Sequence, residues 1–157
     1  MTSRPAPTTA RHRLAKILAQ RGVASRRQAE ELIRQGAVVV AGVTITNVAH
    51  CIVGDEPITV QGRPTFAAPA TQVWAFHKPA GYLCTARDPQ GRPTVFEILP
   101  KKMPRVVSVG RLDFNSEGLL LLTTDGALAQ RLMRSDAPRT YRVRAFGGLS
   151  ADQVAAA

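Results

Sequence analysis

The chain has 157 residues, enough for one ordinary domain or two small ones, and 45% of them are hydrophobic, which excludes a disordered polyelectrolyte. No apolar run approaches the roughly 18 residues that a membrane-spanning helix needs, so the composition argues against an integral membrane protein. The 21 Lys and Arg residues outnumber the 11 Asp and Glu residues, and the net charge of +10 predicts attraction to a polyanion such as nucleic acid.

The first ten residues have a composition typical of a flexible tail. They lack the apolar core of a secretory signal. A basic, acid-poor leader is also compatible with an organelle transit peptide, but Pro5 and Pro7 would interrupt the amphipathic helix that such a peptide forms. We therefore interpret residues 1–10 as a tail ahead of a folded domain.

Two short helices are predicted at the start of the first domain. The segment 14–18 carries apolar side chains at helical spacing, and Gly22 can supply the left-handed residue that ends such a helix. Ser25 followed by Gln28 has the form of a capping box, which begins a second helix. The apolar spacing continues toward Gly36, where we expect the second helix to end.

Short strands and a linker follow the two helices. The run 37–46 is rich in β-branched residues, and Ala41–Gly42 in its middle predicts two strands around a tight turn. Ile58–Val60 is expected to add another strand. Residues 61–72 are rich in Pro, Gly and small side chains, which is typical of a linker rather than a packed element. The predicted division of the chain is a tail at 1–10, a first domain at 11–60, a linker at 61–72 and a second domain at 73–157.

The second half of the chain predicts strands mixed with helices. The elements expected there are, in chain order, a strand at 73–79, a short segment at 94–100, a strand at 105–112, a polar loop at 113–118, a strand at 119–124, a helix at 127–133, a strand at 141–146 and the beginning of a helix at 150–157. Asp125 is interpreted as a helix cap rather than a catalytic group, and Lys78 as the exit of the first strand. The class that these elements indicate is α+β.

The cysteines and histidines show no metal-binding pattern. Cys51 and Cys84 lie far apart in the sequence and do not match a paired ligand spacing such as C-x-x-C. His12, His50 and His77 do not fall at helical spacing with a carboxylate or a thiol, so we interpret them as structural or surface residues. We predict a cytoplasmic protein with reduced thiols and no metal site.

Positive charge is concentrated around the two helices of the first domain, where the sequence opposes it only with Glu30 and Glu31. The basic residues there are Arg11, Arg13, Lys16, Arg21, Arg26, Arg27 and Arg34. Arginine side chains on short helices can bind a phosphate backbone without reading its sequence. The alternative is a solvated helix face that binds nothing, and composition alone does not separate the two.

The order of these features resembles the αL RNA-binding domain, which a small-subunit ribosomal protein, bacterial tyrosyl-tRNA synthetases and several RNA-modifying enzymes share. The matching positions are Leu14, the turn at 22–27, Ala29, Ile33, the step at 36–38 and Ala41–Gly42. The resemblance implies a small module that positions a partner domain on structured RNA. The residues that it implies as contacts with RNA phosphates are Arg13, Lys16, Ser25, Arg26 and Arg27.

One acidic residue, Asp113, lies at a point suited to catalysis. It follows a predicted strand, two residues after Arg111, within the run GRLDFNSEGLLLLTTDG. A polar turn separates it from Leu119–Leu122, which we expect to be buried, so the carboxylate is held between two core strands and rigidly aimed. The alternative is a turn-forming Asp that caps its own loop, a common role for this residue.

The same run resembles the catalytic motif of the bacterial pseudouridine synthases that modify single uridines in small-subunit or large-subunit ribosomal RNA. Residues 74–100 resemble the first strand of that catalytic domain and its loop. Residues 139–145 resemble a later strand that carries an active-site tyrosine. In that family an αL domain precedes the catalytic domain, so the resemblance covers residues 11–157.

The family resemblance implies roles for three residues. Asp113 corresponds to the essential carboxylate that acts on the flipped-out uridine, Arg111 to an arginine that contacts RNA and fills the space of the flipped base, and Tyr141 to a tyrosine that stacks on the uracil. Arg111 could alternatively be a plain surface arginine, and Tyr141 an ordinary core aromatic. Arg139 stands where we expect Lys in this family, which keeps the charge and changes the geometry.

The predicted architecture is therefore α+β: a small αL domain of two helices and short strands, followed by a partial mixed α/β catalytic domain. The implied function is isomerisation of a specific uridine to pseudouridine in ribosomal RNA or a pre-ribosomal particle, by a monomer that needs no cofactor and no membrane. The alternative is a non-catalytic RNA-binding protein or inactive fragment that acts through the basic N-terminal module. Because the family's catalytic domain continues past the tyrosine strand into an Arg-rich motif, we expect this chain to be C-terminally truncated.

Overall fold

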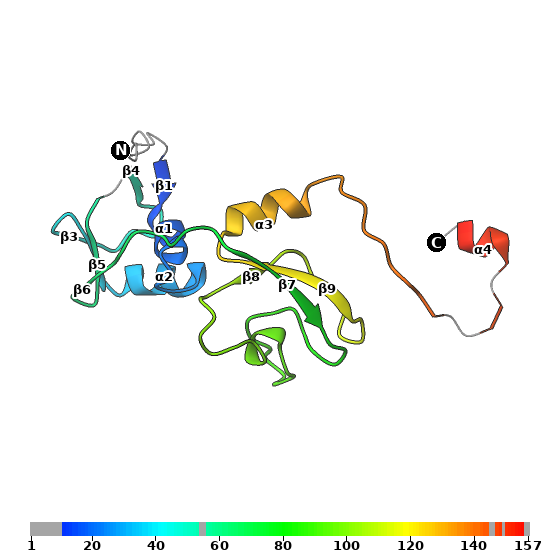
Figure 1. Cartoon of the computed structure of the whole chain (residues 1–157). Helices are drawn as coiled ribbons and strands as arrows, with labels where there is room; N and C mark the ends of the chain where they lie inside the picture. The colour runs from blue at the N-terminus through cyan, green and yellow to red at the C-terminus, as the bar shows by residue number, and fades with distance from the viewer. Residues whose placement is uncertain (1–10, 54–55, 145–146, 149, 156–157) are drawn as a thin grey trace.

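The computed structural model of the chain describes residues 11–53, 56–144, 147–148 and 150–155. Figure 1 shows a first unit of two helices with short strands, followed by a three-stranded sheet with a helix beside it. The elements of the first unit are β1 (Arg11–Arg13), α1 (Leu14–Gln20), α2 (Arg26–Arg34), β2 (Val38–Val40), β3 (Val43–Ile45), β4 (Cys51–Val53), β5 (Ile58–Val60) and β6 (Arg63–Pro64). Those that follow are β7 (Val73–Lys78), the 3-10 helix η1 (Val95–Glu97), β8 (Val107–Ser108), β9 (Gly118–Thr123), α3 (Gly126–Met133) and α4 (Ala151–Ala155).

The ends of α1 and α2 confirm the predicted caps. Gly22 has a φ of 75° and follows α1, where its amide donates to the carbonyl of Ala19 at 3.1 Å. The Ser25 hydroxyl accepts from the amide of Gln28 at 3.2 Å, while the Gln28 side chain accepts from the amide of Ser25 at 3.0 Å. This reciprocal pair is the capping box, and it satisfies two donors that have no partner inside α2.

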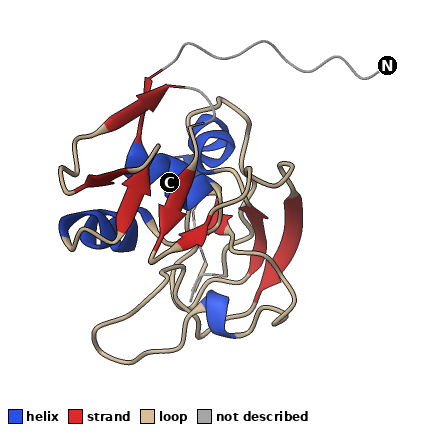
Figure 2. Cartoon of the chain, turned by 90° about the vertical axis from the view of Figure 1, so that its left-hand side faces the viewer, coloured by secondary structure: helices blue, strands red, loops and turns tan. Residues whose placement is uncertain are grey.

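The strands of the first unit form two small antiparallel sheets, which Figure 2 shows from the side of this unit. The predicted hairpin of β2 and β3 is confirmed, with positive φ angles of 47° at Ala41 and 85° at Gly42 in its two-residue turn. The pair of β1 with β4 was not predicted, because three-residue strands with charged or mixed side chains carry no readable alternation. The core beneath these strands consists of buried residues from both helices and both sheets: Leu14, Ala15, Leu18, Ala29, Ile33, Val38, Val40, Ile45, Ile52, Ile58 and Val60.

Part of the predicted linker belongs to the first unit. Residues 63–64 form β6, which pairs with β5, and Thr65 donates from its amide and its hydroxyl to the carbonyl of Ile58 at 2.9 and 3.1 Å. The prediction of an unpacked segment over 61–72 was therefore wrong for its first half. Pro64 contributed to the prediction of a linker, but proline is compatible with an edge strand because the missing donor costs no ladder hydrogen bond there. Residues 66–72 contain no strand or helix.

The second sheet has the strand order β7-β9-β8, and all its pairs are antiparallel. Trp74 and Phe76 of β7 pack on the buried residues Leu120 and Leu122 of β9. The expectation that all four leucines of this strand are buried was wrong, because Leu119 is 67% exposed. Strand side chains alternate between faces, so Leu119 lies on the face opposite to Leu120.

Two predicted strands differ in the structure. The strand expected over 105–112 is reduced to β8, although Val109 still donates to the carbonyl of Leu121 at 2.8 Å. Residues 141–144 form no strand, and residues 145–146 lie outside the described residues. A strand needs a hydrogen-bonded neighbour, and no described strand pairs with 141–144, so the alternation of Tyr141 and Val143 with arginines is not sufficient. No helix in the described part of the chain is long and apolar enough to cross a membrane.

Asp125 caps α3, as predicted. Its carboxylate accepts from the amides of Ala127 at 2.8 Å and Leu128 at 3.1 Å, and the Thr71 hydroxyl donates to it at 3.4 Å. Desolvation raises the pKa of Asp125, but these hydrogen bonds, with the charge of Arg131, outweigh it and lower the pKa below 3.8. A lowered pKa in the folded state means that the carboxylate stabilises the fold above pH 3.8 and loses this contribution as the pH falls through the folded-state value.

We expect Asp125→Ala to lower the free energy of unfolding by about 1 kcal/mol at pH 7, because two amides at the start of α3 lose their acceptor. The difference from the natural chain should shrink in acid, as the pH falls through the lowered folded-state pKa and the natural carboxylate becomes protonated. Asp125→Asn is the matched control, since Asn caps a helix equally well without titrating. Urea unfolding of the three proteins across this pH range measures the effect, and a pH-independent deficit in Asp125→Ala would contradict it.

Candidate active site and RNA-binding surface

Asp113 lies in the loop that connects β8 with β9, and its side chain is exposed. Its backbone carbonyl accepts from the amide of Ser116 at 3.1 Å, which closes a tight turn. Within the described residues its carboxylate accepts no hydrogen bond and forms no ion pair. By contrast, the carboxylates of Asp88 and Asp125 both accept hydrogen bonds from nearby backbone amides. Asp113 therefore does not cap its own loop, and its carboxylate is available to a ligand.

Asp88 shows what a structural carboxylate looks like in the same domain. It accepts from the amides of Gln90 and Arg92 at 3.1 and 3.0 Å and from the Arg92 guanidinium at 2.9 and 3.1 Å. The hydrogen bonds from Arg92 hold the pKa of Asp88 at about 2. Three of these hydrogen bonds end on Oδ2 and one on Oδ1, so this side chain is engaged in closing its loop.

Lys78, at the end of β7, holds the loop of Asp113 in place. Its side chain is completely buried, and its ammonium donates to three backbone carbonyls: Pro79 at 3.0 Å, Phe114 at 3.3 Å and Ser116 at 2.6 Å. Two of these carbonyls belong to residues just after Asp113. A buried ammonium with three carbonyl acceptors satisfies its donors fully, so it holds the backbone of the turn in a fixed position.

Cys84 and Gly81 form further hydrogen bonds with the same loop. The Cys84 thiol donates to the carbonyl of Leu112 and accepts from its amide, both at 3.4 Å. The amide of Gly81 donates to the carbonyl of Phe114 at 2.7 Å. The residues on both sides of Asp113 are thus bound to the segment that follows β7, and this is the rigid placement that a catalytic carboxylate requires.

Arg111 lies on the same loop, two residues before Asp113, and is also exposed. Tyr141 is 64% exposed and belongs to the segment after α3, which Figure 1 shows leading away from the sheet. It makes no hydrogen bond to Asp113 or Arg111 in the described part of the structure, so the expected grouping of all three is not seen. Tyr141 is exposed rather than packed in the core, and its role in the site stays a prediction. Arg139 donates to the carbonyl of Met133 at 3.1 Å and so closes the end of α3.

The predicted RNA-binding residues lie on the first unit. Arg13, Arg26 and Arg27 are exposed, and Lys16 is half-buried on α1. Within the described residues none of the four forms an ion pair, whereas Arg34 pairs with Glu31 at 3.0 Å. The hydroxyl oxygen of Ser25 is occupied by the capping box, so its place near RNA remains a prediction.

Comparisons with known proteins follow the same division of the chain. Residues 12–50 match the S4 domain, and residues 72–155 match the model described as RNA pseudouridylate synthase. An uncharacterised RNA pseudouridine synthase of Rickettsia conorii is 47% identical over 138 residues, which cover 87% of this chain and 60% of that protein. The ribosomal large subunit pseudouridine synthase B of Yersinia pestis is 42% identical over 153 residues, which cover 90% of this chain and 47% of that protein.

A solved structure of a pseudouridylate synthase is 30% identical, with a TM-score of 0.40, and the match covers 76% of this chain and 51% of that one. The chain spans at most 60% of the length of the curated relatives named above. The predicted family resemblance is confirmed by the family model, whose match over residues 72–155 covers more than half of the chain. The protein belongs to the RNA pseudouridylate synthase family and carries an S4 domain ahead of the region that defines this family.

Proposed function

We propose that the protein isomerises uridine to pseudouridine in ribosomal RNA. In this reaction the bond between N1 of uracil and C1′ of ribose breaks, the base rotates, and a bond between C5 and C1′ replaces it. The hydrogen on C5 is lost and N1 gains one, so the atoms and electrons balance without a cofactor. The observation that carries the proposal is the family match over residues 72–155, which includes the whole loop of Asp113.

Asp113 is our candidate for the carboxylate that acts on the target nucleotide. Its exposed side chain and the bound backbone on both sides of it support this assignment. A uridine in folded RNA must first be flipped out of its stack, at a cost of a few kcal/mol. Arg111, exposed on the same loop, is our candidate for the side chain that enters the vacated space, because its planar guanidinium can stack on bases and pair with phosphate.

Tyr141 completes the proposed site by stacking on the flipped uracil. Because this residue lies on the exposed segment after α3, the proposal requires that segment to approach the loop of Asp113 when RNA is bound. The S4 domain supplies most of the affinity in this scheme, through phosphate contacts of Arg13, Lys16, Arg26 and Arg27. The substrate is proposed from the similarity to ribosomal large subunit pseudouridine synthases. We further propose that the protein acts as a monomer in the cytoplasm.

The chain is expected to form pseudouridine when it is incubated with unmodified ribosomal RNA transcripts of both subunits. Carbodiimide labelling followed by primer extension locates the product, and more than one product per protein molecule shows turnover. RNA binding without any pseudouridine would contradict the proposal and favour the alternative, a non-catalytic RNA-binding protein. Pseudouridine at many unrelated positions would contradict the proposal that the protein modifies a specific uridine.

A further inference from the structure

A hollow on the first unit lies between the turn that joins α1 to α2 and the hairpin of β5 and β6. Its volume is about 260 Å³. The residues that line it are Arg21, Gly22, Val23, Val60, Gln61, Arg63, Pro64, Thr65 and Phe66. The lining from the hairpin, residues 60–66, lies between the two family matches, which end at residue 50 and begin at residue 72.

Phe66 is the most unusual member of this lining. The residue is 80% exposed, although a phenylalanine in a folded protein normally buries most of its surface. It follows Thr65 directly, and Thr65 is bound to the carbonyl of Ile58 by two hydrogen bonds. The backbone that leads into Phe66 is thus held on the sheet while the ring stands in solvent. An exposed aromatic ring on an anchored backbone is a suitable platform for stacking a base.

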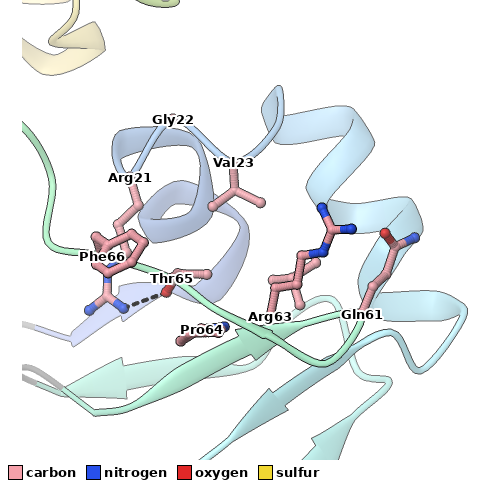
Figure 3. Close-up of a pocket in the computed structure, with 9 residues that line it drawn as sticks. Arg21, Gly22, Val23, Gln61, Arg63, Pro64, Thr65 and Phe66 are labelled. Carbon is pink, nitrogen blue, oxygen red and sulfur yellow. Dashed lines mark hydrogen bonds between the residues drawn. The ribbon is translucent and has the colours of Figure 1, made fainter.

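Two arginines place positive charge at the same hollow. Figure 3 shows Arg21 with Phe66 at one end of it and Arg63 with Gln61 at the other. The Arg21 guanidinium donates to the Thr65 hydroxyl at 2.9 Å, which fixes its position. Arg63 is exposed on β6. Neither arginine forms an ion pair within the described residues, and no acidic side chain is among the residues that line the hollow.

We propose that this hollow binds an unpaired nucleotide of RNA, whose base stacks on Phe66 while the flanking phosphates contact Arg21 and Arg63. A stacking platform beside positive charge is the usual recognition mode for single strands, because every base has a π-face and every linkage a negative charge. Double-stranded RNA buries the faces of its bases, so the ring gives the hollow a preference for unpaired RNA. The proposal rests on RNA as the partner of the protein, but it does not involve Asp113 or the isomerisation.

The test measures the binding of a single-stranded uridine-rich RNA of 12 nucleotides and of a 16-base-pair RNA duplex. Phe66→Ala is expected to weaken single-strand binding roughly 5- to 150-fold, the loss typical of one stacked base, without changing its salt dependence. Arg63→Ala is expected to weaken it and to lower the slope of log K against log salt concentration by about 0.7, the value for one phosphate contact on a single strand. Neither change is expected to alter duplex binding.

Val43→Ala is the matched control, because Val43 is 62% exposed on β3, at the edge of the sheet opposite to β6. It is expected to bind both RNAs as the natural chain does. Phe66→Trp, which keeps a stacking surface, is expected to restore single-strand affinity and to show that Phe66→Ala acts through the ring rather than through the fold. Natural affinity of Phe66→Ala for the single strand overturns the proposal, as does an equal loss on the duplex. Because binding is measured directly, either result stands whether or not the protein forms pseudouridine.

Discussion

Asp113→Asn is expected to abolish pseudouridine formation, with a loss on the order of 10⁴-fold or more in kcat, as is typical when an essential nucleophile or base is removed. The change keeps the size of the side chain and removes its charge, which both proposed roles need. RNA binding is expected to remain, because the carboxylate is exposed and has no partner in the described structure whose loss would disturb the loop. Single-turnover assays on the unmodified transcript that the natural chain acts on, together with a binding titration, separate the two effects.

Asp136→Asn is the control for the loss of one negative charge, since Asp136 is exposed after α3 and has no proposed role. It is expected to retain natural activity. If Asp113→Asn kept more than a tenth of the natural rate, Asp113 would not be the essential carboxylate. If it lost RNA binding as well as activity, its effect would belong to recognition rather than to the chemical step.

Lys78→Met is expected to lower the free energy of unfolding by roughly 3–5 kcal/mol, because three carbonyls lose their donor in a buried place. Methionine keeps most of the volume of the lysine stem, so the loss reports the ammonium rather than a cavity. In the fraction of protein that remains folded, kcat is expected to fall more than RNA affinity, because the loop of Asp113 is no longer held. Urea unfolding followed by single-turnover kinetics at low temperature measures both.

The control for this change is Lys101→Met, which removes the same group from an exposed site in the same domain. Its stability is expected to stay within about 0.5 kcal/mol of the natural value. A Lys78→Met protein with the natural free energy of unfolding would contradict the claim that the Lys78 ammonium stabilises this loop. If the Lys78→Met protein were less stable but fully active once folded, Lys78 would contribute to folding alone and not to the position of Asp113.

The local elements of the first unit could be predicted because their signals are local. The capping box of Ser25 and Gln28, the glycine after α1 and the turn at Ala41–Gly42 all depend on residues within a few positions of one another. The pair of β1 with β4 depends on residues about forty positions apart, and the alternation of three residues is too short to be read. The strand over 141–144 shows the opposite error, in which a suitable composition has no partner strand among the described residues.

For the candidate site, the sequence led to a prediction of the reactive side chains but not of the residues that hold their loop in place. Asp113 and Arg111 could be proposed because they lie two positions apart in a motif, and their roles stay predictions. The supports under the loop were missed, because Lys78 and Cys84 act on backbone carbonyls and amides 28 to 38 positions away. A backbone acceptor has no residue type, so it leaves no pattern in the sequence. One signal was available in Lys78, which ends a strand that begins with four apolar residues, because a lysine is seldom fully buried without a partner.

The pairing of β6 with β5 also shortens the connection between the two parts of the molecule. Thr71 donates to Asp125 and the amide of Gln72 donates to Thr124, so the end of the connection is bound to the second part of the structure. Only residues 66–70 remain between these anchors, and five residues span at most about 18 Å when fully extended. A tether of this length keeps the S4 domain at a high effective concentration near the loop of Asp113 once either part has bound RNA. Lengthening it with a flexible insert would weaken that coupling without removing a single contact.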